Sequence, residues 1–132
     1  MLFDQYNLPN DIFEVVFATE QQVQVGRLLF EEFKAHGGEM GKTEMSLFAT
    51  KLHEGTVVET EEVHGPVKRK IQTKISYNKR QFYDRILTPM KAMGLIGYDL
   101  YKKRYKLSDG FNKTLQKVGV MWMHELSKKQ GF

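Results

Sequence analysis

Residues 67–75 alternate in character along the chain, and a period of two fits a β-strand but not a helix. One set of alternate positions holds Val67, Arg69, Ile71, Thr73 and Ile75, and the other holds Lys68, Lys70, Gln72 and Lys74. The preceding residues, 56–63, are β-branched and acidic, and His64-Gly65-Pro66 separates the two segments. We therefore expect a β-hairpin in the middle of a chain whose remaining apolar residues mostly follow helical spacing.

This hairpin would set an acidic strand, with Glu59, Glu61 and Glu62, against a basic one. Opposite charges across a strand pair stabilise it by roughly 0.2–1 kcal/mol each. The cluster Lys68-Arg69-Lys70 therefore has two explanations, pairing inside the hairpin or contact with phosphates, and the sequence leaves both open.

Two helices are expected before the hairpin. Thr19 and Gln22 have the spacing of a capping box, and Gly37-Gly38 ends the first helix. Its predicted core face consists of Val23, Gly26, Phe30 and Phe33, with Leu29 on the flank. A second helix is predicted over residues 43–53, with Gly55 as its end and a core face of Met45, Phe48, Ala49 and Leu52. The apolar residues before Thr19 should pack either on this chain or on a second subunit: Leu2, Phe3, Ile12, Phe13, Val15, Val16 and Phe17.

After the hairpin, Asn78 can cap a third helix that Gly94 ends, with Pro89 kinking or restarting it. Its predicted core face is Phe82, Ile86, Met90 and Met93. Two short strands over residues 98–101 and 104–107 follow, joined at Lys102-Lys103. A last helix begins after Ser108 or Asp109, with an apolar stripe of Phe111, Leu115, Val118, Trp122 and Leu126.

Charge is divided unevenly along the 132 residues. Residues 1–64 hold 4 Lys and Arg against 12 Asp and Glu, whereas residues 65–132 hold 16 against 4. The halves could neutralise each other in the fold, or the basic half could attract a polyanion. The chain has no Cys, no apolar run long enough to span a membrane and no leader-like N-terminus, so we expect a cytoplasmic protein without disulfides or membrane contact.

The segment "ILTPMKAMGLIGYDLYKKRYKLSDG" resembles the end of a winged helix-turn-helix domain, as in MarR-like or PadR-like transcriptional regulators. In such proteins an apolar residue, a short gap and Gly-Leu-Ile close the recognition helix, and a basic wing ends in Tyr-x-Leu-Ser. The resemblance implies a mainly α protein with a small β component (α+β). It also implies one domain over residues 1–132: a packing arm (1–18), a winged-helix core (19–110) and a C-terminal dimerisation helix (111–132). The predicted hairpin would be an insertion between helices two and three, unless helix two is wrongly assigned.

This resemblance implies that double-stranded DNA is the partner, and the third helix would enter the major groove. Residues facing away from its predicted core face would meet the bases, because Arg reads guanine and Gln reads adenine. Lysines and other arginines would contact phosphates, and Asp84 could accept from cytosine or pair with Arg80. The predicted DNA-binding residues are Lys79, Arg80, Gln81, Tyr83, Asp84, Arg85, Thr88, Lys91, Lys102, Lys103 and Arg104.

The last helix is expected to form a homodimer, because Trp and Met are frequent at interfaces. The predicted interface residues are Val118, Met121, Trp122, Met123 and Leu126. No spacing typical of a metal or phosphate-binding motif is present, so we expect no enzymatic activity, cofactor or metal. Two other hypotheses remain: a winged-helix module that binds protein through the acidic half, and a replication or partition protein that binds DNA in the same way.

Overall fold

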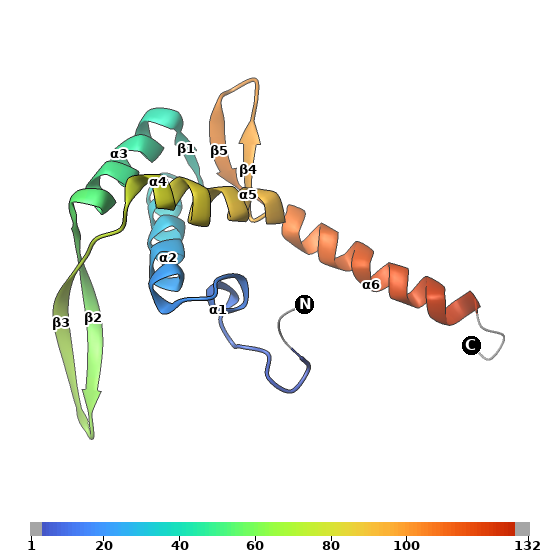
Figure 1. The fold of residues 1–132 in the computed structure, drawn as a ribbon, viewed down its shortest axis with the longest axis horizontal. Coiled ribbons are helices and arrows are strands. Elements are labelled where there is room, and N and C mark those ends of the chain that lie inside the picture. Colours follow the sequence, from blue (N-terminus) through green and yellow to red (C-terminus); the bar gives the residue numbers. More distant parts are fainter. Residues whose placement is uncertain (1–3, 129–132) are drawn as a thin grey trace.

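The computed structural model describes residues 4–128, apart from the side chains of residues 60–62 and 64. Its architecture is α+β, as the sequence predicted (Figure 1). The helices are α1 (Ile12–Val16), α2 (Glu20–Ala35), α3 (Lys42–Glu54), α4 (Lys79–Phe82), the π turn η1 (Tyr83–Leu87), α5 (Thr88–Met93) and α6 (Gly110–Lys128). The strands are β1 (Glu39–Gly41), β2 (Thr56–His64), β3 (Val67–Ile75), β4 (Ile96–Asp99) and β5 (Arg104–Leu107).

The core lies between α2, α3 and the continuous helical segment α4–η1–α5. Its largest fully buried side chains are Phe33, Phe82, Leu29, Met40, Met45, Leu52, Ile86, Ile96 and Val25. The predicted face of α3 is confirmed, with Met45, Ala49 and Leu52 buried and Phe48 packed at the edge. The predicted face of α2 is confirmed in part, because Gly26 and Phe33 are buried. Val25 and Leu29 are fully buried as well, whereas Val23 and Phe30 are only half-buried.

The caps that the sequence predicted are present. The Thr19 hydroxyl accepts a hydrogen bond from the backbone N–H of Gln22 at 3.1 Å. Gly37 and Gly38 both adopt positive φ after α2, and the N–H of Gly38 donates to the Phe33 carbonyl at 2.7 Å. Asn78 caps α4 by accepting from the N–H of Gln81 at 3.1 Å.

The N-terminal arm packs on α2 through Phe13 and Phe17, whereas Ile12, which was also expected to pack, is exposed. Phe17 is buried, and its ring lies where a Cβ on Gly26 would come within 2.5 Å, so only glycine leaves room for this close approach. Phe13 packs against Phe30 with ring centroids 5.8 Å apart. Leu2 and Phe3 lie outside the described residues.

The hairpin of β2 and β3 is confirmed, and the two strands pair antiparallel from Thr56↔Ile75 to His64↔Val67. The register sets Glu61 opposite Lys70, and Lys70 also lies 4.0 Å from Glu59, so part of the basic cluster is paired inside the hairpin. The hairpin projects from the body between α3 and α4, on the side away from β4 and β5 (Figure 1).

Pro89 changes the third helix more than the sequence indicated. Its missing N–H and its ring are incompatible with an α-helical bond to the Arg85 carbonyl. The helix opens into η1 there, and the N–H of Thr88 bonds to the Tyr83 carbonyl five residues back. With the residue that the π turn adds, the neighbours Ile86 and Leu87 are both buried, so Leu87 belongs to the core. Met93, which was predicted to be in the core, is half-buried.

Gly94 ends this segment in the left-handed conformation, with φ of 86°. The chain then forms β4, β5 and, beyond them, α6. In the sheet the order is β1-β5-β4, and all neighbours are antiparallel. The first predicted strand was placed too late: β4 ends at Asp99, because the Asp99 carboxylate accepts from the N–H groups of Tyr101 and Lys102 and turns the chain.

Helix α6 extends away from the body after its first turn (Figure 1). The N–H of Phe111 bonds to the Gly94 carbonyl at 3.0 Å, and this contact fixes the start of the helix. None of its residues 110–128 is buried in the single chain. Residues 129–132 of the predicted C-terminal helix lie outside the described residues.

Candidate nucleic-acid interface

The solvent side of α4–η1–α5 carries most of the predicted base-reading residues. Gln81, Arg85, Thr88 and Lys91 are exposed, and the Arg80 side chain is 91% exposed. Within the π turn, Arg85 is exposed and its neighbour Ile86 is buried. The sequence-predicted outer face of this helix is therefore a single exposed surface.

Asp84 lies on the same face as Arg80. Its carboxylate is 3.9 Å from the Arg80 Nε, one helical turn away. Both side chains are exposed, so the pair contributes at most a few tenths of a kcal/mol to stability. The pairing hypothesis for Asp84 is the arrangement observed, and it orients the guanidinium along the helix.

Lys79 is held by α3 instead of extending outward. Its ammonium lies 2.9 Å from the Thr50 hydroxyl and 3.2 Å from the Ser46 hydroxyl, and its backbone N–H donates to His53 Nδ1 at 3.0 Å. The sequence predicts a phosphate contact for Lys79, and in the single chain its side chain links α4 to α3. A lysine reaching two hydroxyls of another helix has no sequence signature.

Tyr83 also faces inward more than predicted. It is half-buried, and its ring packs edge-on against Phe82 with centroids 5.4 Å apart. This places it beside the core, and it also lines an open hollow together with Lys79 and Arg80.

A cluster of tyrosines and lysines connects the helix to the β4–β5 hairpin. The ammonium of Lys91 on α5 lies 5.5 Å from the Tyr98 ring centroid and 5.6 Å from that of Tyr105. Lys42, at the start of α3, approaches the Tyr98 ring from 5.5 Å. Burial raises the pKa of Tyr105, and the neighbouring Tyr83 and Tyr98 add to that shift. Cations thus lie at the junction where α3, α5 and the hairpin meet.

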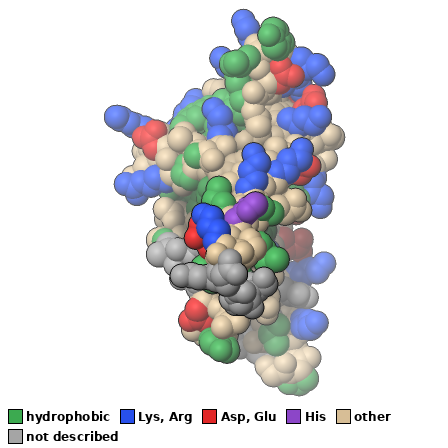
Figure 2. All heavy atoms as spheres, turned by 90° about the vertical axis from the view of Figure 1, so that its right-hand side faces the viewer, with side chains coloured by type: hydrophobic (Ala, Val, Ile, Leu, Met, Phe, Trp, Pro, Cys, Tyr) green, Lys and Arg blue, Asp and Glu red, His purple; other side chains and the backbone are tan. Residues whose placement is uncertain are grey.

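The turn between β4 and β5 spans Leu100, Tyr101, Lys102 and Lys103. Lys102 and Lys103 are exposed, as predicted. Hydrogen bonds from the N–H groups of Lys102 and Tyr101 lower the pKa of Asp99, so this carboxylate is charged at neutral pH. Seen along α6, hydrophobic and basic side chains occur together at the top of the molecule, where this turn lies (Figure 2).

Arg104 does not extend from the turn. Its Nε is 3.4 Å from Glu39, and its Nη2 is 3.6 Å from Glu44, so its charge is shared by two carboxylates between β1 and α3. The DNA contact of Arg104 stays a prediction, and in the single chain its side chain links β5 to β1 and α3. These ion pairs were not predicted, because the sequence does not show that β1, which carries Glu39, pairs with β5.

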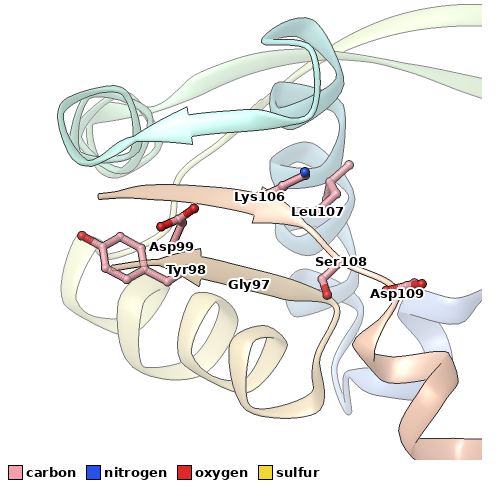
Figure 3. Close-up of a pocket in the computed structure, with 7 residues that line it drawn as sticks. All are labelled: Gly97, Tyr98, Asp99, Lys106, Leu107, Ser108 and Asp109. Carbon is pink, nitrogen blue, oxygen red and sulfur yellow. The ribbon is translucent and has the colours of Figure 1, made fainter. Parts of the chain in front are cut away.

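An open hollow of about 580 Å³ lies on the outer side of the hairpin, next to the first residues of α6 (Figure 3). Asp99 and Asp109 contribute carboxylates to it, and Lys106 contributes one ammonium. The lining of the hollow therefore carries both acidic and basic groups, whereas the charged side chains of α5 and the turn are basic.

Within residues 4–128 no cluster of His, Cys, Asp and Glu has the arrangement of a metal site. None of the helices described there is long and apolar enough to cross a membrane. We found no family model, curated protein or solved structure that matches this chain.

Proposed function

We propose that the chain is a winged-helix protein that binds double-stranded DNA sequence-specifically and acts as a dimeric transcriptional regulator. In this assignment α2, α3 and α4–η1–α5 are the three helices, β4–β5 is the wing, and β2–β3 is an insertion between the second and third helices. The order of the sheet, with β1 pairing with the second wing strand, agrees with this assignment.

The observation that carries the proposal is the contact of Lys91 with Tyr98 and Tyr105. It brings the exposed face of the third helix next to the wing at Lys91, which supports a basic surface formed by both. A helix that enters the major groove, beside a basic wing that follows the backbone, is the arrangement that duplex recognition needs. Arg80, Gln81 and Thr88 would meet base edges, and Arg85, Lys91, Lys102 and Lys103 would contact phosphates.

The dimer is the second part of the proposal. Val118, Met121, Trp122 and Met123 are 47–64% exposed, on a helix with no buried residue in the single chain. Leu126 is half-buried on the same helix. Pairing α6 with the same helix of a second copy would remove this apolar surface from water. A two-fold dimer would bind a palindromic site.

Fluorescence anisotropy with a labelled random-sequence duplex tests DNA binding. The affinity should fall steeply with salt, with a slope on logarithmic axes that grows with the number of phosphates contacted. Lys103→Ala should weaken all duplexes alike and reduce that slope by about 1. Lys117→Ala removes an exposed lysine of α6 instead. It is the matched control and should leave the slope unchanged. If random duplex does not bind at low salt, the proposal is wrong.

Sequence reading is tested separately by selecting bound duplexes from a random pool. Arg80→Ala should relax the preference at one position, at a cost of about 1–3 kcal/mol. If the sequence preference of Arg80→Ala is unchanged, Arg80 does not contact a base. Salt-independent binding of a protein partner in place of DNA would favour the alternative, a protein-binding winged-helix module.

A further inference from the structure

The turn between β4 and β5 presents large apolar side chains directly to solvent. Leu100 is 77% exposed, and Tyr101 is 98% exposed. Turns are normally built from Gly, Pro, Asn, Asp and Ser, which tolerate the backbone geometry and water. Both side chains bury little apolar surface within the single chain. Their role is therefore expected in contacts between the tip and a partner.

The turn that carries them is held in one conformation. The Asp99 carboxylate accepts from Tyr101 N–H at 2.9 Å and from Lys102 N–H at 3.1 Å. Lys103 adopts a φ of 53°, the only positive φ outside glycine among residues 4–128. A fixed turn loses little entropy on binding, so the two side chains are preorganised for a partner.

The charges beside the tip indicate the chemistry of that partner. Lys102 and Lys103 follow the two apolar residues directly, and both are exposed. Lys91 and Lys42 lie against Tyr98, on the first strand of the same hairpin. A polyanion that also has flat apolar surfaces fits this combination of apolar and basic side chains. Duplex DNA is such a molecule, because phosphates line its grooves and stacked bases lie between them.

We propose that the tip enters the minor groove and that Tyr101, supported by Leu100, wedges into a base step and bends the duplex. This inference rests on the DNA-binding function proposed above and adds a deformation to it. Apolar wedges in the minor groove partly unstack a base step and kink DNA by about 20–90°. Flexible steps such as TA kink most easily, so the tip would contribute to sequence preference without hydrogen bonds to the bases.

Energy transfer between dyes at the two ends of a short duplex with a central TA step measures the bend. Binding of the wild-type protein should raise the transfer, and saturating Tyr101→Ala should leave it near the value of free DNA. Affinity for this duplex should fall about tenfold in Tyr101→Ala, as for loss of one base-stacking contact, with an unchanged salt slope because no charge is removed. Tyr101→Phe should retain the bend.

Two further variants separate the wedge from other effects. Tyr6→Ala removes a tyrosine that is 86% exposed elsewhere on the surface and should bind and bend as the wild type does. Lys103→Ala should bind more weakly but still bend the duplex at saturation. Circular dichroism checks that each variant remains folded.

The outcomes distinguish this inference from the proposed function. Salt-dependent binding without a bend, or an equal bend with Tyr101→Ala, would overturn the wedge and leave DNA binding intact. Failure to bind any duplex at low salt would overturn both. Binding of the protein to anionic phospholipid vesicles, lost in Tyr101→Ala and without duplex bending, would assign the tip to a lipid surface and also overturn the wedge.

Discussion

Gly94 is the joint between α5, the β4–β5 hairpin and α6, and replacing it tests whether that joint is rigid. Its φ of 86° lies in the left-handed region, which costs other residues about 1–2 kcal/mol. A Cβ there would also lie 2.7 Å from the Phe111 nitrogen and 2.9 Å from the Gly110 carbonyl carbon. Both are backbone atoms, so the start of α6 must move, and such overpacking costs roughly 1–3 kcal/mol more.

We therefore expect Gly94→Ala to lower the free energy of unfolding by about 2–5 kcal/mol, measured by urea denaturation at fixed protein concentration. Gly37→Ala is the matched control, because φ there is 70° and no atom lies within 4 Å of the added Cβ. It should cost only the backbone part, about 1–2 kcal/mol. Gly119→Ala, inside α6 and also uncrowded, should stabilise by about 0.5–1 kcal/mol. Equal losses for Gly94→Ala and Gly37→Ala would refute the close contact at the joint.

Three other predictions concern the core, the dimer and the turn. Phe82→Ala should lower the free energy of unfolding by about 3–5 kcal/mol, because this ring is fully buried, whereas Leu47→Ala on the exposed side of α3 should change it by about 0.5 kcal/mol or less. Trp122→Glu should give a single-chain mass by sedimentation, whereas Val120→Glu, on the opposite side of α6, should remain dimeric; a dimer in both would place the interface elsewhere. The folded-state pKa of Asp99 lies below the ordinary 3.8. The charged carboxylate therefore orders the turn fully above pH 3.8, and this order is lost as the pH falls through the lower, folded-state pKa. The amide NMR signals of Tyr101 and Lys102 should report a midpoint below 3.8, and a midpoint at or above it would contradict the two hydrogen bonds to Asp99.

Local chemistry in the sequence predicted the elements well. Thr19, Asn78, Gly55 and Gly94 mark helix ends through side-chain caps or positive φ, which depend only on near neighbours. The β2–β3 hairpin followed from alternation and a Gly-Pro turn. These features predicted the α+β class and the order of the longer elements, but neither α1 nor β1.

Features that depend on distant contacts were missed or misplaced. The buried face of α2 includes Val25 and Leu29, because the packing of α1, η1 and β1 decides which side is covered. Lys79 and Arg104 looked like DNA contacts in the sequence, yet α3 and β1 provide the groups that hold them. The exposed Tyr101 was assigned to a strand, since nothing in the sequence showed that Asp99 would turn the chain two residues earlier.

The central claim is that the third helix and the wing bind one duplex together, and an NMR titration tests it most directly. Amide signals are followed while an unlabelled short duplex is added at low salt. The account predicts that Gln81, Thr88 and Lys103 shift together and saturate at the same DNA concentration, while Gln24 on α2 stays in place. Shifts confined to the helix, to the wing or to α2, or no shift at all, would contradict a shared DNA-binding face.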